Sequence, residues 1–133
     1  MKLVAILIGA VLISACTADS PGAPTGPVDT PLVLAPGQTA DVAYTHIQLR
    51  FDGVSGDSRC PADVVCIQAG DAIVRIEVLP KSGAARAYDL HTGNRQPVRH
   101  DDLTIALENL SPYPFSSRTI APGDYRATLR VTR

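Results

Sequence analysis

The chain has 133 residues, of which 45% are hydrophobic, and a formal net charge of −1. This length suits one globular domain and leaves no room for a second. Twelve Lys and Arg residues are balanced by thirteen Asp and Glu residues, so the sequence does not indicate the clustered basic surface of a nucleic-acid-binding protein.

Residues 1–15 have the layout of a secretory signal peptide. Lys2 precedes the apolar run Leu3–Ile13, which is too short to span a bilayer as a mature helix. The segment ends in Ile13-Ser14-Ala15-Cys16, which resembles the lipobox of bacterial lipoprotein signal peptides. The resemblance implies that residues 1–15 are removed and that Cys16 is acylated and anchors the chain to a membrane. The alternative is an ordinary secretory signal, with Cys16 incidental.

The next segment is predicted to be a tether. Residues 17–31 contain four prolines, two glycines and almost no large apolar side chain. Such a composition cannot bury enough surface to offset its ordering entropy. We therefore predict a lipidated flexible tether over residues 16–30 and a folded domain over residues 31–133. Lipoproteins kept in the inner membrane commonly carry Asp after the cysteine, and Thr17 here favours the outer membrane of the bacterial envelope.

Alternation of apolar and polar residues is the main signal in the folded domain. It predicts half-buried antiparallel strands in four segments, which are residues 45–53, 71–80, 102–110 and 124–133. Weaker strand candidates are residues 31–35, 39–44, 86–92 and 96–100. Seven or eight short strands separated by Gly-containing turns predict an all-β fold, an antiparallel two-sheet β-sandwich of immunoglobulin-like type.

Cys60 and Cys66 flank a proline in the segment SRCPADVVC, residues 58–66. Export to an oxidising compartment, with Cys16 acylated, leaves these two as an even pair, so we predict a Cys60–Cys66 disulfide. It would stabilise the fold by about 2–3 kcal/mol through chain entropy. A redox pair is less favoured because the spacing is not C-x-x-C. A zinc site is less favoured because it needs about four ligands.

The segment around these cysteines, residues 56–70, is the longest interruption between strong strands, and binding usually resides in such loops. One hypothesis is a rigid recognition loop that presents Arg59 and Asp63, with Asp57 beside them. The other is structural: Asp57 or Ser58 caps backbone amides, and Arg59 pairs with a carboxylate. A calcium site formed by Asp57, Asp63 and Asp52 is a weaker option, because no D-x-D-x-D-G loop is present.

Two further groups of residues are candidates for function. Tyr113 and Phe115 stand between prolines in LSPYPFSS, residues 110–117, as an exposed hydrophobic contact or as a corner packed on the core. His91 and His100 bracket a plausible hairpin turn, in which they would face each other and bind a metal, or else lie at solvated strand ends.

The segment D-S-R-C-P-x4-C-x3-G at Asp57–Gly70, with Pro112-Tyr113-Pro114 and a terminal strand containing Tyr125, resembles a group of small bacterial lipoproteins with no assigned activity. This chain has Gln68 where members of that group often have an aromatic residue. The resemblance implies an envelope-anchored β-sandwich and supplies no catalytic residues.

Known catalytic motifs such as G-x-S-x-G, H-E-x-x-H and the glycine-rich phosphate loop do not occur in the sequence. The leading hypothesis is therefore a non-enzymatic binding or interaction module, without a cofactor, anchored by lipid in the bacterial envelope. Its partner would be an unknown envelope protein or ligand. The alternatives are a structural subunit that pairs through a sheet edge, and a metal-binding or enzymatic domain that uses His91 and His100.

Overall fold

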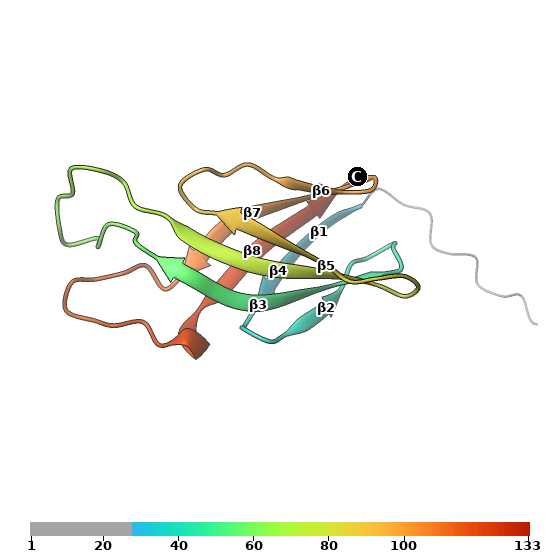
Figure 1. The fold of residues 1–133 in the computed structure, drawn as a ribbon, viewed down its shortest axis with the longest axis horizontal. Helices are drawn as coiled ribbons and strands as arrows, with labels where there is room; N and C mark the ends of the chain where they lie inside the picture. The colour runs from blue at the N-terminus through green and yellow to red at the C-terminus, as the bar shows by residue number, and fades with distance from the viewer. Residues whose placement is uncertain (1–27) are drawn as a thin grey trace, which may run out of the picture.

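A computed structural model describes residues 28–133 of the chain (Figure 1). The predicted signal peptide, Cys16 and nearly all of the predicted tether lie outside the described residues. The described part contains eight strands and one short 3₁₀ helix, η1. In chain order they are β1 (Asp29–Leu34), β2 (Thr39–Asp41), β3 (Ile47–Asp57), β4 (Ala72–Pro80), β5 (Arg86–His91), β6 (Val98–His100), β7 (Leu103–Ser111), η1 (Pro122–Asp124) and β8 (Arg126–Thr132). No helix within residues 28–133 is long and apolar enough to cross a membrane.

The strands form two four-stranded sheets in which all neighbours are antiparallel. One sheet has the order β1-β8-β7-β6 and the other has the order β2-β3-β4-β5. The predicted all-β, two-sheet architecture is confirmed. Strands that are consecutive in sequence lie beside each other, so each sheet contains a meander, whereas immunoglobulin domains have Greek-key connections.

The alternation in the sequence explains which side chains form the core. In β3, Leu49 and Phe51 are fully buried, and their neighbours Gln48 and Asp52 are exposed. The same period buries one face of each of the other long strands, because successive strand residues point to opposite sides of a sheet. The core between the sheets includes Val74, Ile76, Val78, Leu103, Ile105, Ala127, Leu129 and Val131. All four strong strand predictions and all four weaker ones correspond to strands of the structure.

The start of the domain is earlier than predicted. Strand β1 begins at Asp29, so the last two residues of the predicted tether belong to the sheet. Val28 is buried, and its carbonyl accepts a hydrogen bond from the Arg133 amide over 3.2 Å. The composition of this segment is tether-like, but pairing with β8 orders its last residues.

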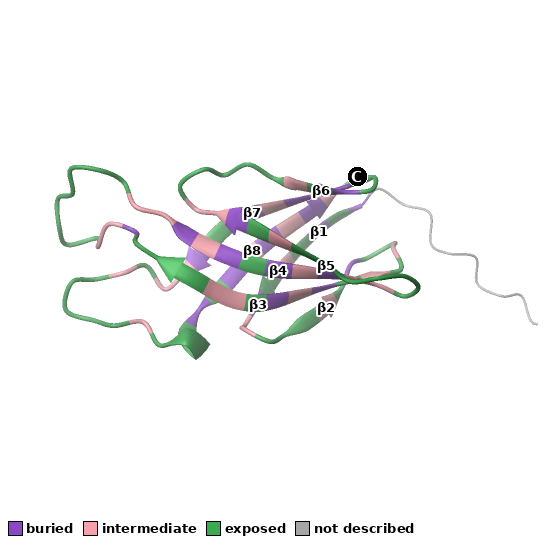
Figure 2. Cartoon of the chain, viewed as in Figure 1, coloured by how far each residue is buried: buried purple, intermediate pink, exposed green. Residues whose placement is uncertain are grey.

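The two ends of the sandwich differ. At one end the first described residues lie beside the C-terminus, since Asp29 pairs with Thr132. At the other end lie two long connections, residues 58–71 between β3 and β4 and residues 112–121 between β7 and η1 (Figure 1, left). We call these two segments together the tip. Most of the tip is exposed, whereas buried residues concentrate in the strands (Figure 2).

The segment 58–71 is closed at its base by hydrogen bonds between its first and last residues. The Ser58 amide donates to the Asp71 carbonyl over 2.7 Å, and the Asp71 amide donates to Ser58 Oγ over 3.1 Å. Gly70 lies inside this closure: a Cβ added there would be 1.5 Å from the Ser58 carbonyl oxygen. A side chain at position 70 is therefore incompatible with the closed base.

Replacing Gly70 with alanine should destabilise the protein by more than about 3 kcal/mol, because the clash is with backbone atoms and the base of the loop must open. Gly123→Ala is the matched control, since a Cβ there would meet nothing within 4 Å, and it should change stability by less than about 0.5 kcal/mol. Urea unfolding of both variants measures the difference. Equal stabilities would show that the closed base is not a rigid part of the fold.

Candidate functional site

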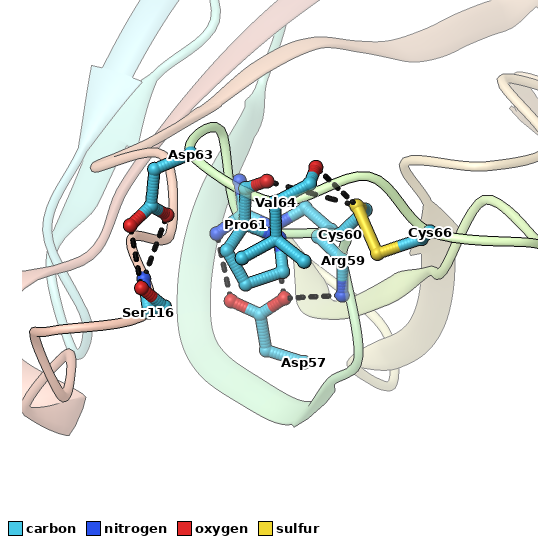
Figure 3. Close-up of a disulfide and its surroundings, with 8 residues drawn as sticks. All are labelled: Asp57, Arg59, Cys60, Pro61, Asp63, Val64, Cys66 and Ser116. Carbon is cyan, nitrogen blue, oxygen red and sulfur yellow. Dashed lines mark hydrogen bonds and ion pairs between the residues drawn. A yellow bond between two sulfur atoms is a disulfide. The ribbon is translucent and has the colours of Figure 1, made fainter.

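The two segments of the tip are joined to each other by hydrogen bonds. The Ala62 amide donates to the Pro114 carbonyl over 2.9 Å, and the Ser116 amide donates to Asp63 Oδ1 over 2.9 Å. Figure 3 shows Asp63 directed at Ser116 in this way. Residues more than 50 positions apart in sequence thus form one surface, with Asp63 as part of its internal bonding.

The predicted disulfide is present within the tip. Cys60 and Cys66 are bonded, with their Cα atoms 6.0 Å apart (Figure 3). The bond closes a small ring, residues 60–66, which we call the ring. Closing it restricts the unfolded chain, which accounts for the expected stabilisation.

Beneath the ring, Arg59 and Asp57 form an ion pair that lies largely out of solvent. The Arg59 Nε and Nη2 groups donate to the two Asp57 carboxylate oxygens over 2.9 and 2.7 Å. The exposed fractions of their side chains are 6% for Arg59 and 12% for Asp57. The Arg59 backbone amide also donates to Asp57 Oδ1, over 3.2 Å. Such two-pronged pairing fixes the guanidinium in direction as well as position.

The same pair connects the two sheets. Arg59 Nη1 donates to the Leu110 carbonyl in β7 over 2.8 Å, and its Nη2 donates to the Pro112 carbonyl over 3.0 Å. The Tyr125 hydroxyl, just before β8, donates to Asp57 Oδ2 over 3.0 Å. The end of β3 is therefore bonded to the end of β7 and the start of β8. We call Asp57, Arg59 and Tyr125 the polar clamp.

This geometry decides between the two hypotheses for the loop. The prediction that Arg59 is presented as an exposed recognition residue is wrong, because its guanidinium is buried and bonded to Asp57 and two carbonyls. The structural alternative, in which Arg59 pairs with a carboxylate, is the arrangement observed. The cause is a long-range contact that the local sequence does not contain, since Leu110 lies 51 residues from Arg59.

The hydrogen bonds of the polar clamp shift the pKa values of its members. Burial opposes the ionisation of Asp57, but hydrogen bonds from the Arg59 side chain and amide and from the Tyr125 hydroxyl outweigh it, so the Asp57 pKa lies below its ordinary value. Burial raises the Tyr125 pKa, and the hydrogen bond to ionised Asp57 raises it further. The hydrogen bond to Asp57 raises the Arg59 pKa. The pair is therefore charged at neutral pH.

Tyr113 and Phe115 are both about half exposed on the second segment of the tip. The Arg59 guanidinium carbon lies 5.4 Å from the centre of the Tyr113 ring, within the range of a cation–π contact. The exposed hydrophobic contact predicted for these aromatics is thus geometrically available. Tyr113 also lines a cavity of about 290 Å³, together with Arg59, Cys60, Gly70, Arg95, Glu108 and Asn109.

The most exposed apolar side chains of the tip were not among the predicted site residues. Val65 is 99% exposed and Ile67 is 104% exposed, and Val64 beside them is 45% exposed. Their nearly complete exposure contrasts with the strands, where most apolar residues are buried, and a group of exposed apolar side chains marks a candidate contact surface. The sequence signal was an apolar run, Val64-Val65-Cys66-Ile67, inside a segment whose cysteines and proline mark it as a loop.

The histidine pair does not exist as predicted. Strands β5 and β6 belong to different sheets, so residues 92–97 cross between sheets and do not form a hairpin turn. His91 Nδ1 lies 2.5 Å from Asp71 Oδ2, and His100, which is buried, has its Nδ1 2.9 Å from the Tyr88 hydroxyl. Each histidine is thus bonded to a different side chain, His91 to Asp71 and His100 to Tyr88.

The proposed calcium ligands are also separated. Asp52 pairs with Arg50, Asp57 with Arg59, and Asp63 bonds Ser116. Within residues 28–133, no three His, Cys, Asp or Glu residues come together as a metal site. The metal alternatives therefore lack the geometry on which they depended.

Comparison with known proteins adds no assignment: no protein-family profile matches the chain, and no curated protein or solved structure is significantly similar to it.

The lowered pKa of Asp57 predicts a pH dependence of stability. The unfolded chain binds the Asp57 proton more readily than the folded chain does, so the stabilisation is complete at neutral pH and is lost as the pH falls below the ordinary carboxyl value of about 3.9. Asp57→Asn should lower the free energy of unfolding at pH 7 by about 3 kcal/mol, because it leaves the buried Arg59 charge unpaired.

Urea unfolding between about pH 7 and pH 2 tests this prediction. The wild-type protein should lose more stability over this range than Asp57→Asn. Both proteins should still lose some stability as the pH falls, because Asp63 and Asp71 also contribute. Hydrogen bonds outweigh the effect of burial at these two carboxylates and lower their pKa values. Parallel curves for the two proteins would show that the Asp57–Arg59 pair does not contribute as described.

Proposed function

We propose that the protein is a lipid-anchored component of the bacterial envelope and acts as a non-enzymatic binding module whose contact surface is the tip. The observation that carries the proposal is the exposure of Val65 in the ring and of Ile67 directly after it, in a segment hydrogen-bonded to the one that exposes Tyr113 and Phe115. Apolar patches of this kind on monomeric proteins mark interaction sites with proteins or membranes.

The position of the tip supports this proposal. The chain enters the sandwich at Asp29, at the end opposite to the tip. If Cys16 carries the lipid anchor, the anchored segment joins the sandwich at the end opposite to the tip, so its point of attachment does not occlude the tip. The polar clamp and the disulfide hold the tip in one shape, which reduces the entropy lost on binding.

A second candidate function is that of a structural subunit, and one observation favours it. Among the four edge strands of the described sheets, β2 and β6 have three residues each and β1 contains Pro31. Strand β5 has six residues and no proline, so its free edge is the best suited to pair with another chain. The exposed residues of β5 are Arg86, Ala87 and Asp89, and Asp89 pairs with Arg75, so this strand exposes no large apolar side chain.

Photo-crosslinking in intact cells tests the binding proposal. A benzophenone amino acid at position 67 should give crosslinked products, to protein or to lipid, that are lost when Val65→Asp is added. The same amino acid at position 33 is the control, because Val33 is exposed on β1, away from the tip. Equal products from positions 67 and 33 would refute the tip as the contact surface.

The anchor is tested in the same cells. Cys16→Ser should move the chain from the membrane fraction to the soluble fraction, because a chain without acyl groups loses the anchoring that two or more such groups provide. An unchanged membrane fraction, with no acyl mass on the wild-type N-terminus, would contradict lipidation.

A further inference from the structure

We propose that the surface bound by the tip is a lipid bilayer, into whose interface the first segment of the tip inserts Val65 and Ile67. This inference rests on the proposed function, because it takes the tip as the contact surface and names its partner. It is supported by the shape of the tip, its charges and the distance between the tip and the start of the domain.

The shape of the tip suits a bilayer. Val65 and Ile67 are as exposed as side chains without neighbours, so they project into solvent and do not line a groove. A projecting aliphatic pair needs a cavity of matching shape in a protein partner, but it needs none in a bilayer. The ring is also kept closed by the Cys60–Cys66 disulfide and held by the Ala62–Pro114 hydrogen bond, so it does not collapse onto the sandwich.

The ring carries little charge. Asp63 is the only charged residue within the ring, and its carboxylate is bonded to the amide of Ser116. Arg59, the next charge along the chain, is buried below the ring and paired with Asp57. Insertion of Val65 and Ile67 to the depth of the interface, about 5–10 Å, thus brings one charge of the ring to the level of the headgroups, the Asp63 carboxylate, whose oxygens are hydrogen-bonded to Ser116.

The second segment of the tip contributes aromatic side chains. Tyr113 and Phe115 are half exposed beside the ring. Tyr113 has a polar end, and such aromatic side chains prefer the level of the lipid headgroups, whereas the Phe115 ring adds apolar surface. The tip thus combines projecting aliphatic residues with neighbouring aromatic residues, which matches an interface of acyl chains and headgroups.

The energies also fit a tethered domain. Burying two aliphatic side chains, those of Val65 and Ile67, gives partition coefficients of only about 10²–10⁴. Such binding is weak for a protein free in solution. It is sufficient for a domain that a lipid anchor keeps at the membrane, because tethering raises the effective concentration to the millimolar range.

The length of the chain outside the structure allows the tip to reach the membrane that holds the anchor. Strand β3 runs the length of the sandwich to the base of the tip, and its 11 residues span about 35 Å. About 12 residues separate Cys16 from Val28, and fully extended they reach about 40 Å. The tip can therefore contact the same bilayer when the domain stands or leans with its tip downward.

Tryptophan fluorescence tests the inference, because the sequence contains no tryptophan. The mature chain carrying Cys16→Ser, which has no acyl group, receives Ile67→Trp as a probe. With millimolar vesicles of phosphatidylethanolamine and phosphatidylglycerol, or of phosphatidylcholine alone, its emission should shift to the blue, and brominated lipids should quench it. Val33→Trp is the matched control and should not respond, and adding Val65→Asp to the Ile67→Trp protein should abolish the shift.

The outcomes are separable. No shift of the Ile67→Trp emission with either lipid, or a shift only with the anionic vesicles, would overturn insertion driven by apolar side chains. If crosslinks from position 67 to protein persist in cells in that case, the tip remains a contact surface and its partner is a protein. If the crosslinks are also absent, the proposed function fails together with the inference.

Discussion

The ion pair between Asp57 and Arg59 is the interaction on which the arrangement of the tip depends. The pairing of two strands fixes their register. It does not fix the conformation of the long connections at the ends of the sheets. Arg59 does so by bonding the Leu110 and Pro112 carbonyls of the other sheet, while Tyr125 bonds Asp57 from the start of β8. Removing one partner would leave a buried charge unpaired, so the network holds as a unit.

This constraint explains how apolar side chains remain exposed in a small domain. A flexible loop that contains Val64, Val65 and Ile67 would lower its free energy by folding these residues onto the nearest apolar surface. Here the ring is closed by a disulfide, its base is fixed by Ser58 and Gly70, and its flank is bonded to Pro114. The exposure is therefore maintained by polar and covalent bonds, which is consistent with a surface kept available for a partner.

The fold was predictable because alternation is local, and the site was less predictable because its contacts are not. The pattern around Leu49 and Phe51 identifies a strand and its buried face without any knowledge of its neighbours. The pairing of Cys60 with Cys66, which the structure confirms, was predicted because these two cysteines form an even pair once Cys16 is taken to be acylated. In contrast, alternation does not reveal which sheet a strand joins, and the expected hairpin between His91 and His100 failed for that reason. The burial of Arg59 depends on a hydrogen bond to Leu110, 51 residues away, and no pattern in the sequence around Arg59 indicates this contact.

Amide hydrogen exchange in Arg59→Met tests most directly whether the polar clamp holds the tip. The informative amides are those of Ala62 and Ser116, which donate the hydrogen bonds between the two segments of the tip, and the amides of Val74 and Leu129 report on the core. We expect protection to fall at Ala62 and Ser116 by at least tenfold relative to the core amides. Wild-type protection at Ala62 and Ser116 in a folded Arg59→Met protein would contradict the account.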